Sequence, residues 1–229
     1  MKQPTEPFRG FTPTTFQFFN ELKEYNYKPW FDEHKPVYEA EIVRPLKALA
    51  HILSPAMYAI DPMIETNPNK VVSRIYRDIR FSKDKTPYRT AMWISFQRIS
   101  TNWQNFPCYY LGISDSGYSY GMGLYLPERK KMDALRSRIE YEPKYFRKMT
   151  TSLIGKYAFS IGGEAYKRTI NSSLPEYFQQ WIQRKSIYLY KRFPVGAELF
   201  TTDFATSLTN EYILLQPLYN YLIETCFNY

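Results

Sequence analysis

Basic side chains are concentrated in one short stretch of the sequence, residues 74–90. Six of them lie there with two acidic residues, so the stretch carries a charge of +4, half of the chain's formal +8. Arginine and lysine side chains bind phosphate and carboxylate groups through charge-assisted hydrogen bonds. The stretch therefore predicts a cationic site for an anionic, phosphorylated ligand. The expected ligand contacts are Arg74, Arg80, Lys83, Lys85 and Arg89.

Arg77 is expected to be the buried anchor of this site. β-Branched and aromatic residues favour a strand over Val71–Phe81, and alternate residues of a strand share a face. Arg77 then lies in an apolar row, and a guanidinium there needs a carboxylate, carbonyl groups or a bound anion. We expect it to pair with Asp78 or with another carboxylate. The apolar row comprises Ile75, Arg77, Ile79 and Phe81, and the opposite row comprises Arg74, Tyr76, Asp78 and Arg80.

The residues that follow complete the candidate site. Ser82–Pro87 is expected to be a loop, because the residue before a proline favours an extended backbone. A second strand is expected over Tyr88–Gln97, and Tyr88 would form a wall of the site or donate a hydrogen bond. The candidate ligand-binding residues are Arg74, Arg77, Asp78, Arg80, Lys83, Lys85, Tyr88 and Arg89.

Three functions are consistent with these residues. The first is binding of an anionic small molecule; if it includes catalysis, Asp78 or Asp84 is the first candidate for a general base. The second is a nucleic-acid-binding module, in which tyrosines stack on bases between the basic residues. The third is a structural or protein-interaction domain without catalytic activity, in which Arg77 and Asp78 belong to an ion-pair network and the lysines are solvated.

Other chemistries lack their residues. Two histidines and two scattered cysteines do not supply a zinc ligand set, and neither a paired-carboxylate motif nor a phosphate-binding glycine loop is present. We therefore expect no metal and no cofactor. Among the histidines and cysteines, His34, beside Asp32 and Glu33, is the candidate for a metal or acid–base role, although a histidine in such a place is more often a helix surface residue.

The central stretch resembles the signature of a known family. Its pattern is Arg74-x-x-Arg77-Asp78-x-Arg80-Phe81-x-x-x-Lys85-x-Pro87-Tyr88-Arg89-Thr90, and Trp30-Phe31-x-x-His34-Lys35-x-x-Tyr38 and Gly121–Pro127 also fit. These motifs resemble the domain-of-unknown-function 2461 family over nearly the whole chain. Members tend to carry Lys in place of Arg89, and a loop with proline and glycine in place of Lys167–Leu174. Because the family has no established activity, the resemblance implies an architecture and a candidate site but no reaction.

Composition points to the same classes of partner. A pI of about 9.2 favours anionic partners such as nucleic acid or phosphorylated metabolites. Cys108 and Cys226 are far apart in the sequence, and we expect both to be reduced and buried in a cytoplasmic protein. The polar N-terminal residues do not resemble a signal peptide, and no apolar run approaches the length that spans a membrane. We therefore expect no membrane partner.

The order of the predicted elements indicates an α+β fold in one domain, residues 1–229. N-terminal helices are expected within residues 12–53, a central and mostly antiparallel sheet within 71–126, and a mostly helical part over 127–229, with helices from both ends packed against the sheet. A hairpin is expected from Tyr109–Ser114 and Tyr118–Leu126. Gly121 and Gly123 share one face of it, which leaves room for another backbone or for a ligand.

The remaining elements are expected as follows. Periodic apolar residues predict a helix from Thr12, a helical region from Trp30 to Leu53 that Pro36 and Pro45 kink or divide, and then a connector over Ser54–Lys70. Later helices are expected from Pro127, over Pro143–Lys156, over Leu174–Ile182 and over Thr209–Thr225. Short strands are expected over Phe159–Gly163 and Ser186–Lys191.

Overall fold

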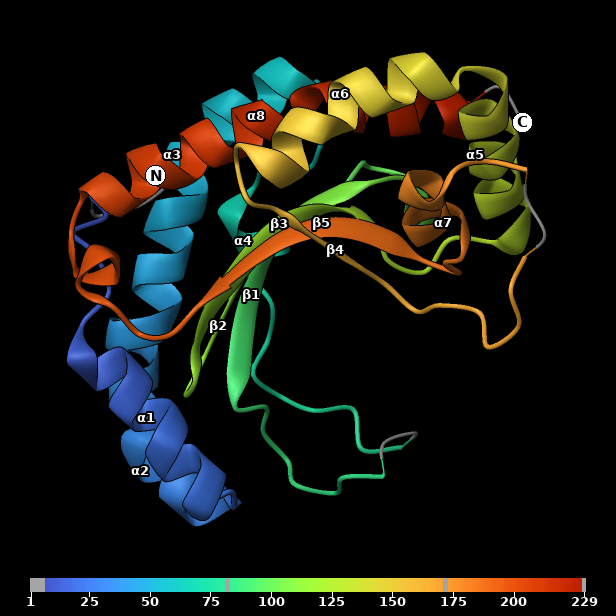
Figure 1. The fold of residues 1–229 in the computed structure, drawn as a ribbon. Helices are drawn as coiled ribbons and strands as arrows, with labels where there is room; N and C mark the ends of the chain where they lie inside the picture. The colour runs from blue at the N-terminus through green and yellow to red at the C-terminus, as the bar shows by residue number, and fades with distance from the viewer. Residues whose placement is uncertain (1–6, 81–82, 171–172, 228–229) are drawn as a thin grey trace. The chain divides into compact units, whose positions relative to one another are not determined.

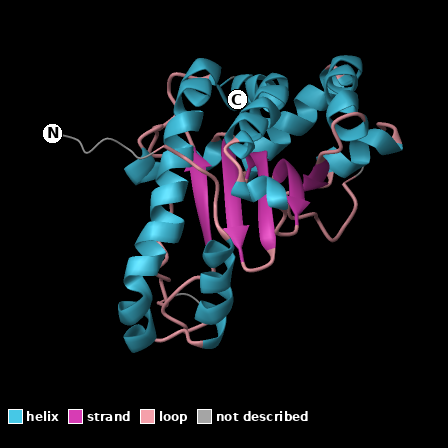
Figure 2. Cartoon of the chain, turned by 90° about the vertical axis from the view of Figure 1, so that its left-hand side faces the viewer, coloured by secondary structure: helices cyan, strands magenta, loops and turns pink. Residues whose placement is uncertain are grey.

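The computed structural model describes residues 7–80, 83–170 and 173–227. Figure 1 shows helices and strands intermixed along the chain, and Figure 2 distinguishes them by colour. The strands form one antiparallel sheet in the order β1-β2-β3-β5-β4. The predicted α+β class and antiparallel sheet are therefore confirmed.

Within the described residues this sheet has five strands, and helices lie before it, between its later strands and after it in the chain. The helices before it are α1 (Pro13–Glu24), α2 (Lys28–Tyr38), the π-helical turn η1 (Glu39–Val43), α3 (Arg44–Ile60) and α4 (Pro68–Val71). The central elements are β1 (Ala91–Phe96), η2 (Trp103–Asn105), β2 (Cys108–Ser114) and β3 (Gly117–Leu124). The later elements are α5 (Arg129–Tyr141), α6 (Pro143–Gly155), β4 (Ser160–Gly162), α7 (Glu176–Ile182), β5 (Ile187–Phe193), η3 (Ala197–Phe200) and α8 (Asp203–Phe227).

The chain divides into two compact units. The first comprises Met1–Phe96, Tyr110–Ser119 and Arg192–Asn210, and the second comprises Gln97–Tyr109, Tyr120–Lys191 and Glu211–Tyr229. The expectation that residues 1–229 form one domain stays a prediction. Among the described residues, no helix combines the length and the apolar character that crossing a bilayer requires.

The first unit buries an aromatic core beneath its helices. Pro13 opens α1, as expected for proline at the first helical position. α1 packs against α2, and α3 packs against β1. α1 buries one stripe of apolar side chains, while Tyr25, just after the helix, is exposed. The stripe comprises Phe16, Phe18, Phe19 and Leu22.

The helical region after α1 extends further than predicted. It continues through Ser54 and Pro55 to Ile60, so the predicted connector begins with helix. The Ser54 hydroxyl donates to the Ala50 carbonyl and also lies 2.9 Å from the Thr66 carbonyl, so it joins the helix to the chain that returns along it. The register changes to a π-helical turn between Pro36 and Pro45, as an interruption by these prolines predicts.

The strand predicted over Val71–Phe81 is wrong. Val71 ends α4, whose N-cap Asn67 accepts a hydrogen bond from the Asn69 amide at 3.0 Å. The chain that follows has only two isolated antiparallel bridges, Val72↔Ile94 and Tyr76↔Tyr88, within its described part. β1 accordingly begins at Ala91 and not at Tyr88, and Phe81 lies outside the described residues.

The second unit shows why the hairpin strand carries glycines. A Cβ atom on Gly121 would lie 2.0 Å from the Leu189 carbonyl oxygen, and one on Gly123 would lie 2.2 Å from that of Ile187. The glycines therefore make room for the backbone of β5 and not for a ligand. The hairpin itself is confirmed, with β2 and β3 adjacent in the sheet.

Several helix and strand ends in the chain beyond the hairpin differ from the prediction. α5 begins at Arg129, two residues after Pro127, and α8 begins at Asp203, six residues before the predicted Thr209. β5 extends two residues beyond Lys191 to Phe193. The predicted positions of α6, α7 and β4 agree with the structure to within about two residues at each end.

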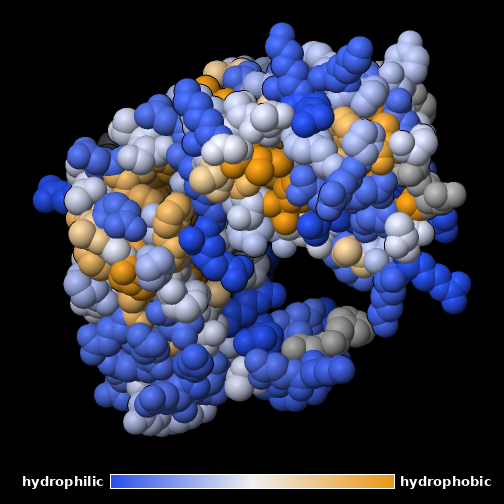
Figure 3. All heavy atoms as spheres, in the orientation of Figure 1, coloured by the Kyte–Doolittle hydropathy of each residue, from blue (hydrophilic) through white to orange (hydrophobic). Residues whose placement is uncertain are grey.

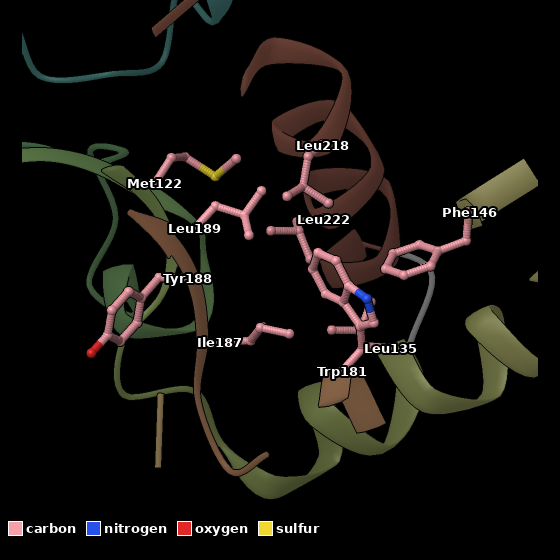
Figure 4. Close-up of a pocket in the computed structure, with 9 residues that line it drawn as sticks. All are labelled: Met122, Leu135, Phe146, Trp181, Ile187, Tyr188, Leu189, Leu218 and Leu222. Atoms are coloured by element: carbon pink, nitrogen blue, oxygen red, sulfur yellow. The ribbon is translucent and has the colours of Figure 1, made fainter. Parts of the chain in front are cut away.

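The core of the second unit contains a small apolar void. Its volume is about 10 Å³, enough for one water molecule. Figure 4 shows aliphatic and aromatic side chains around it, while the Tyr188 ring points away. The Trp181 Nε1 is buried without a hydrogen-bond partner in the described part of the chain. A lining with one donor does not hold water well, so the void is a feature of packing and not a ligand site.

We expect Gly123→Ala to lower the melting temperature, because the new methyl group would force β3 and β5 apart. Overpacking of this kind costs about 1–3 kcal/mol. The matched control is Gly155→Ala at the end of α6, where nothing lies within 4 Å of the added Cβ. That change should be neutral or stabilising by up to about 1 kcal/mol. Thermal unfolding followed by circular dichroism measures both, and equal melting temperatures would contradict the proposed contact.

Candidate functional site

The basic segment, residues 74–90, is closed at its base by backbone hydrogen bonds. The Arg77 amide donates to the Pro87 carbonyl, and the Arg89 amide donates to the Ile75 carbonyl, both at 2.8 Å. Ser73 makes two hydrogen bonds to the Trp93 backbone. Its amide donates to the Trp93 carbonyl, and its side-chain hydroxyl accepts from the Trp93 amide. The two ends of the segment are therefore fixed next to β1. In Figure 3 the part of the surface formed by this segment is mostly hydrophilic.

α2 and the residues before it brace this base at Tyr88. The Tyr88 ring is 4% exposed and stacks on Phe31, with ring centroids 4.1 Å apart. Asn26 accepts the Tyr88 amide hydrogen bond and donates to the Tyr88 carbonyl, both at 3.0 Å. Burial raises the Tyr88 pKa, so the hydroxyl stays protonated at neutral pH. Tyr88 is thus a buried support at the base of the segment. The sequence predicted that it forms a wall of the site or donates a hydrogen bond to the ligand.

The N-terminal motif and the central motif meet at this point. Besides the stack of Phe31 on Tyr88, the edge of the Phe31 ring contacts Tyr76. Tyr38 hydrogen-bonds the Ile75 backbone, and burial together with the Glu39 charge raises the Tyr38 pKa to about 12. Two sequence patterns about forty residues apart therefore form one aromatic cluster under the basic segment.

Arg77 lies at the centre of the segment's polar contacts. Its Nη2 donates to the Tyr88 carbonyl at 3.2 Å and pairs with Asp84 Oδ2 at 3.0 Å. The side chain is 23% exposed, and its Nε is buried without a hydrogen-bond partner among the described residues. Arg77 is therefore held by Asp84, the second of the two acidic residues, and not by its neighbour Asp78.

Asp78 is held by a different arginine. Both of its oxygens bind the Arg80 guanidinium, at 2.9 Å from Nε and 2.7 Å from Nη2, and Oδ1 also accepts the Arg80 amide. The hydrogen bonds from Arg80 lower the Asp78 pKa to about 2. This aspartate therefore stays ionised and engaged at neutral pH.

Asp84 is engaged in the same way. One of its oxygens accepts the Thr86 amide at 2.9 Å and the Thr86 hydroxyl at 2.8 Å. These bonds, and to a lesser degree the Arg77 charge, lower the Asp84 pKa. An effective general base has a pKa near the working pH. The structure therefore gives no support to Asp78 or Asp84 as a general base.

Four of the six basic residues have no carboxylate partner within residues 7–80, 83–170 and 173–227: Arg74, Lys83, Lys85 and Arg89. Arg74, Lys83 and Lys85 are exposed. Lys85 Nζ donates to the Ile79 carbonyl at 2.8 Å. The Arg89 guanidinium lies over the Trp93 ring, 4.8 Å from its centroid, and is near enough to Asp78 to contribute to its lowered pKa.

The structure gives His34 a packing role. Its ring stacks on Trp30 with centroids 4.0 Å apart, and its Nδ1 lies 2.8 Å from the Trp30 carbonyl oxygen. In this arrangement Nδ1 donates to the carbonyl, which fixes the ring on the surface of α2. The described residues also contain no group of three or more His, Cys, Asp or Glu side chains placed to bind a metal.

Two features of the site were not predicted from the sequence. The first is Asn26, because nothing in a single asparagine indicates a bonding partner 62 positions away. The other feature is a groove of about 280 Å³ on the sheet of the first unit, with Trp93 in its wall. Gly112 and Ser114, two small residues on one face of the predicted strand Tyr109–Ser114, were the available signal for an open sheet face.

We expect Asn26→Ala to destabilise the base of the segment, because it removes two hydrogen bonds and leaves the Tyr88 amide and carbonyl without them. Such a loss costs about 1–3 kcal/mol. Hydrogen exchange should show faster exchange at the Tyr88 amide, with a lower melting temperature. The control Gln17→Ala removes only an exposed bond to Glu21 on α1 and should change neither measurement.

Comparison with known proteins supplies a family. A search of curated proteins finds no match. The family model described as "Conserved hypothetical protein (DUF2461)" matches residues 14–221, which include both motifs that meet at Tyr88. The match covers most of the sequence, so this chain belongs to the DUF2461 family.

Proposed function

We propose that the protein binds an anionic, phosphate-bearing ligand through residues 74–90. The observation that carries the proposal is the set of four basic residues without a carboxylate partner in the described chain, on a segment fixed at its base. A rigid base lowers the conformational entropy that a loop loses when it binds a ligand. A phosphate group has several oxygen atoms that can accept charge-assisted hydrogen bonds from a group of arginine and lysine side chains.

The six basic residues take two kinds of role in this proposal. Arg77 and Arg80, paired with Asp84 and Asp78, keep the segment in its conformation. The ligand contacts are the four residues without carboxylate partners, and Arg80 adds its charge at the exposed end. The Nε of Arg77, buried without a partner among the described residues, is a further donor that a bound oxygen atom can satisfy.

A second candidate function is binding of single-stranded nucleic acid. The observation in its favour is Tyr76, which is 54% exposed beside Arg74 and Arg77. Exposed aromatic rings among basic side chains stack on successive bases. This candidate differs from the first in its salt dependence, because a polymer releases many counterions when it binds.

We also propose a cytoplasmic location. Cys108 and Cys226 are both buried and form no disulfide within the described residues, and burial raises the Cys226 pKa to about 11. Buried, protonated thiols are unreactive and are common in proteins of reducing compartments.

We expect the Lys83→Gln, Lys85→Gln double variant to bind inorganic pyrophosphate at least about tenfold more weakly than the parent protein, because charge-assisted bonds contribute more than neutral ones. Isothermal titration calorimetry at low and high salt measures the affinity. The matched control is Lys144→Gln, Lys148→Gln on α6, which changes the net charge equally at exposed lysines.

Three other outcomes would contradict the proposal. An equal loss in both double variants would mean that only net charge matters. Binding restricted to short RNA or DNA and abolished at high salt would favour the nucleic-acid module. If neither pyrophosphate nor short RNA or DNA binds, and both double variants keep the parent melting temperature, the structural or protein-interaction domain is favoured.

A further inference from the structure

The groove on the sheet of the first unit adjoins the basic segment. It has a volume of about 280 Å³ and is formed by β1, the end of β2, the start of β3 and the end of β5. This volume is close to the lower limit of about 300 Å³ for small-molecule pockets. The side chains that determine its chemistry are Trp93, Ser114, Ser116, Ser119 and Arg192.

The floor of the groove is open because of Gly112. A Cβ atom added there would meet only Ser119, 3.7 Å from its hydroxyl oxygen, which is an ordinary contact. The backbone at Gly112 is not in a conformation that requires glycine. The absence of a side chain at this position therefore leaves space over the strand and leaves the Ser119 hydroxyl uncovered.

The lining is neutral or positive. It combines one indole ring with three serine hydroxyls, and none of the lining residues is acidic. The Ser119 hydroxyl has no hydrogen-bond partner among the described residues, while the Ser114 and Ser116 hydroxyls lie 3.0 Å apart. The exposed Arg192 adds positive charge. A flat ring and several hydroxyls suit a ligand with an aromatic part and a sugar part.

Trp93 joins the groove to the basic segment. Its ring lines the groove, and the Arg89 guanidinium lies 4.8 Å from the ring centroid. Its backbone is fixed by two hydrogen bonds to Ser73 at the base of the segment. An anion bound by Arg89 is therefore next to the wall of the groove, within reach of the remainder of the same small molecule.

We infer that the ligand is a nucleoside phosphate, a conclusion that rests on the proposed anion binding by residues 74–90. Its phosphate binds the basic segment at Arg89, its base stacks on Trp93, and its sugar hydroxyls bond the serines of the groove. Every base has a flat face that can stack on an aromatic ring. The groove therefore accepts the class of nucleoside phosphates without selecting one base.

The experiment compares three probes by isothermal titration calorimetry: inorganic phosphate, ribose 5-phosphate and adenosine monophosphate. Adenosine monophosphate should bind at least about tenfold more tightly than inorganic phosphate, because the stacking of one base on an aromatic ring raises the affinity by about that factor or more. Gly112→Val, which fills the groove, should remove this advantage and leave phosphate binding unchanged. Ser119→Leu, on the neighbouring strand, should do the same if the first variant folds poorly.

The control separates this inference from the proposed function. The Lys83→Gln, Lys85→Gln variant should weaken all three probes by the same factor, because it changes the anion contacts alone. Unchanged selectivity in folded Gly112→Val and Ser119→Leu variants, or equal affinity for ribose 5-phosphate and adenosine monophosphate, would overturn the groove assignment while leaving anion binding intact. Failure of all three probes to bind the parent protein would overturn both.

Discussion

The stack of Tyr88 on Phe31 is the contact on which the candidate site depends. Tyr88 is the residue at which the returning end of the basic segment meets α2, and its amide and carbonyl are both bonded by Asn26. The same carbonyl accepts a bond from Arg77. A buried ring with a fully bonded backbone is hard to displace, because moving it exposes apolar surface and leaves polar groups unpaired. This contact gives a defined base to a segment whose described residues form no helix and no extended strand.

Above that base, electrostatics determine the conformation of the segment. Each of the two aspartates binds an arginine side chain and also a backbone amide two residues ahead of it. Hydrogen bonds between a side chain and a backbone amide nearby in the sequence give the backbone an alternative to the hydrogen bonds of a β-sheet. The aspartates therefore neutralise two arginines and turn the chain, and the other basic residues of the segment are left without carboxylates in the described structure. Surface ion pairs contribute little stability, which makes conformation their main effect here.

The sequence predicted the α+β class, the antiparallel hairpin, the helix that opens after Thr12 and the segment of highest positive charge. Each follows from local patterns such as apolar periodicity, turn residues and charge density. It did not predict Asn26 as the partner of Tyr88, Asp84 as the partner of Arg77, or the backbone of β5 over Gly121 and Gly123. These features depend on which distant residues meet, and a single residue type contains no information about a partner elsewhere in the chain. The sequence predicts an end of this helix at Leu53, two residues before Pro55, but α3 continues to Ile60, and Ser54 bonds both the helix and the chain that returns along it.

The error at Val71–Phe81 is related to the proposed function. Its β-branched and aromatic residues favour a strand, but a strand there would pair its backbone with a neighbour along its whole length. The described structure shows pairing only at Val72 and Tyr76, and past Tyr76 the chain follows the bonds of Asp78 and Asp84. A paired strand would place alternate basic side chains on opposite faces. The irregular backbone of the described residues escapes this alternation, so successive basic side chains are able to face one ligand. The departure from regular structure is therefore compatible with the proposed anion binding, and the packing of Tyr88 offsets its cost.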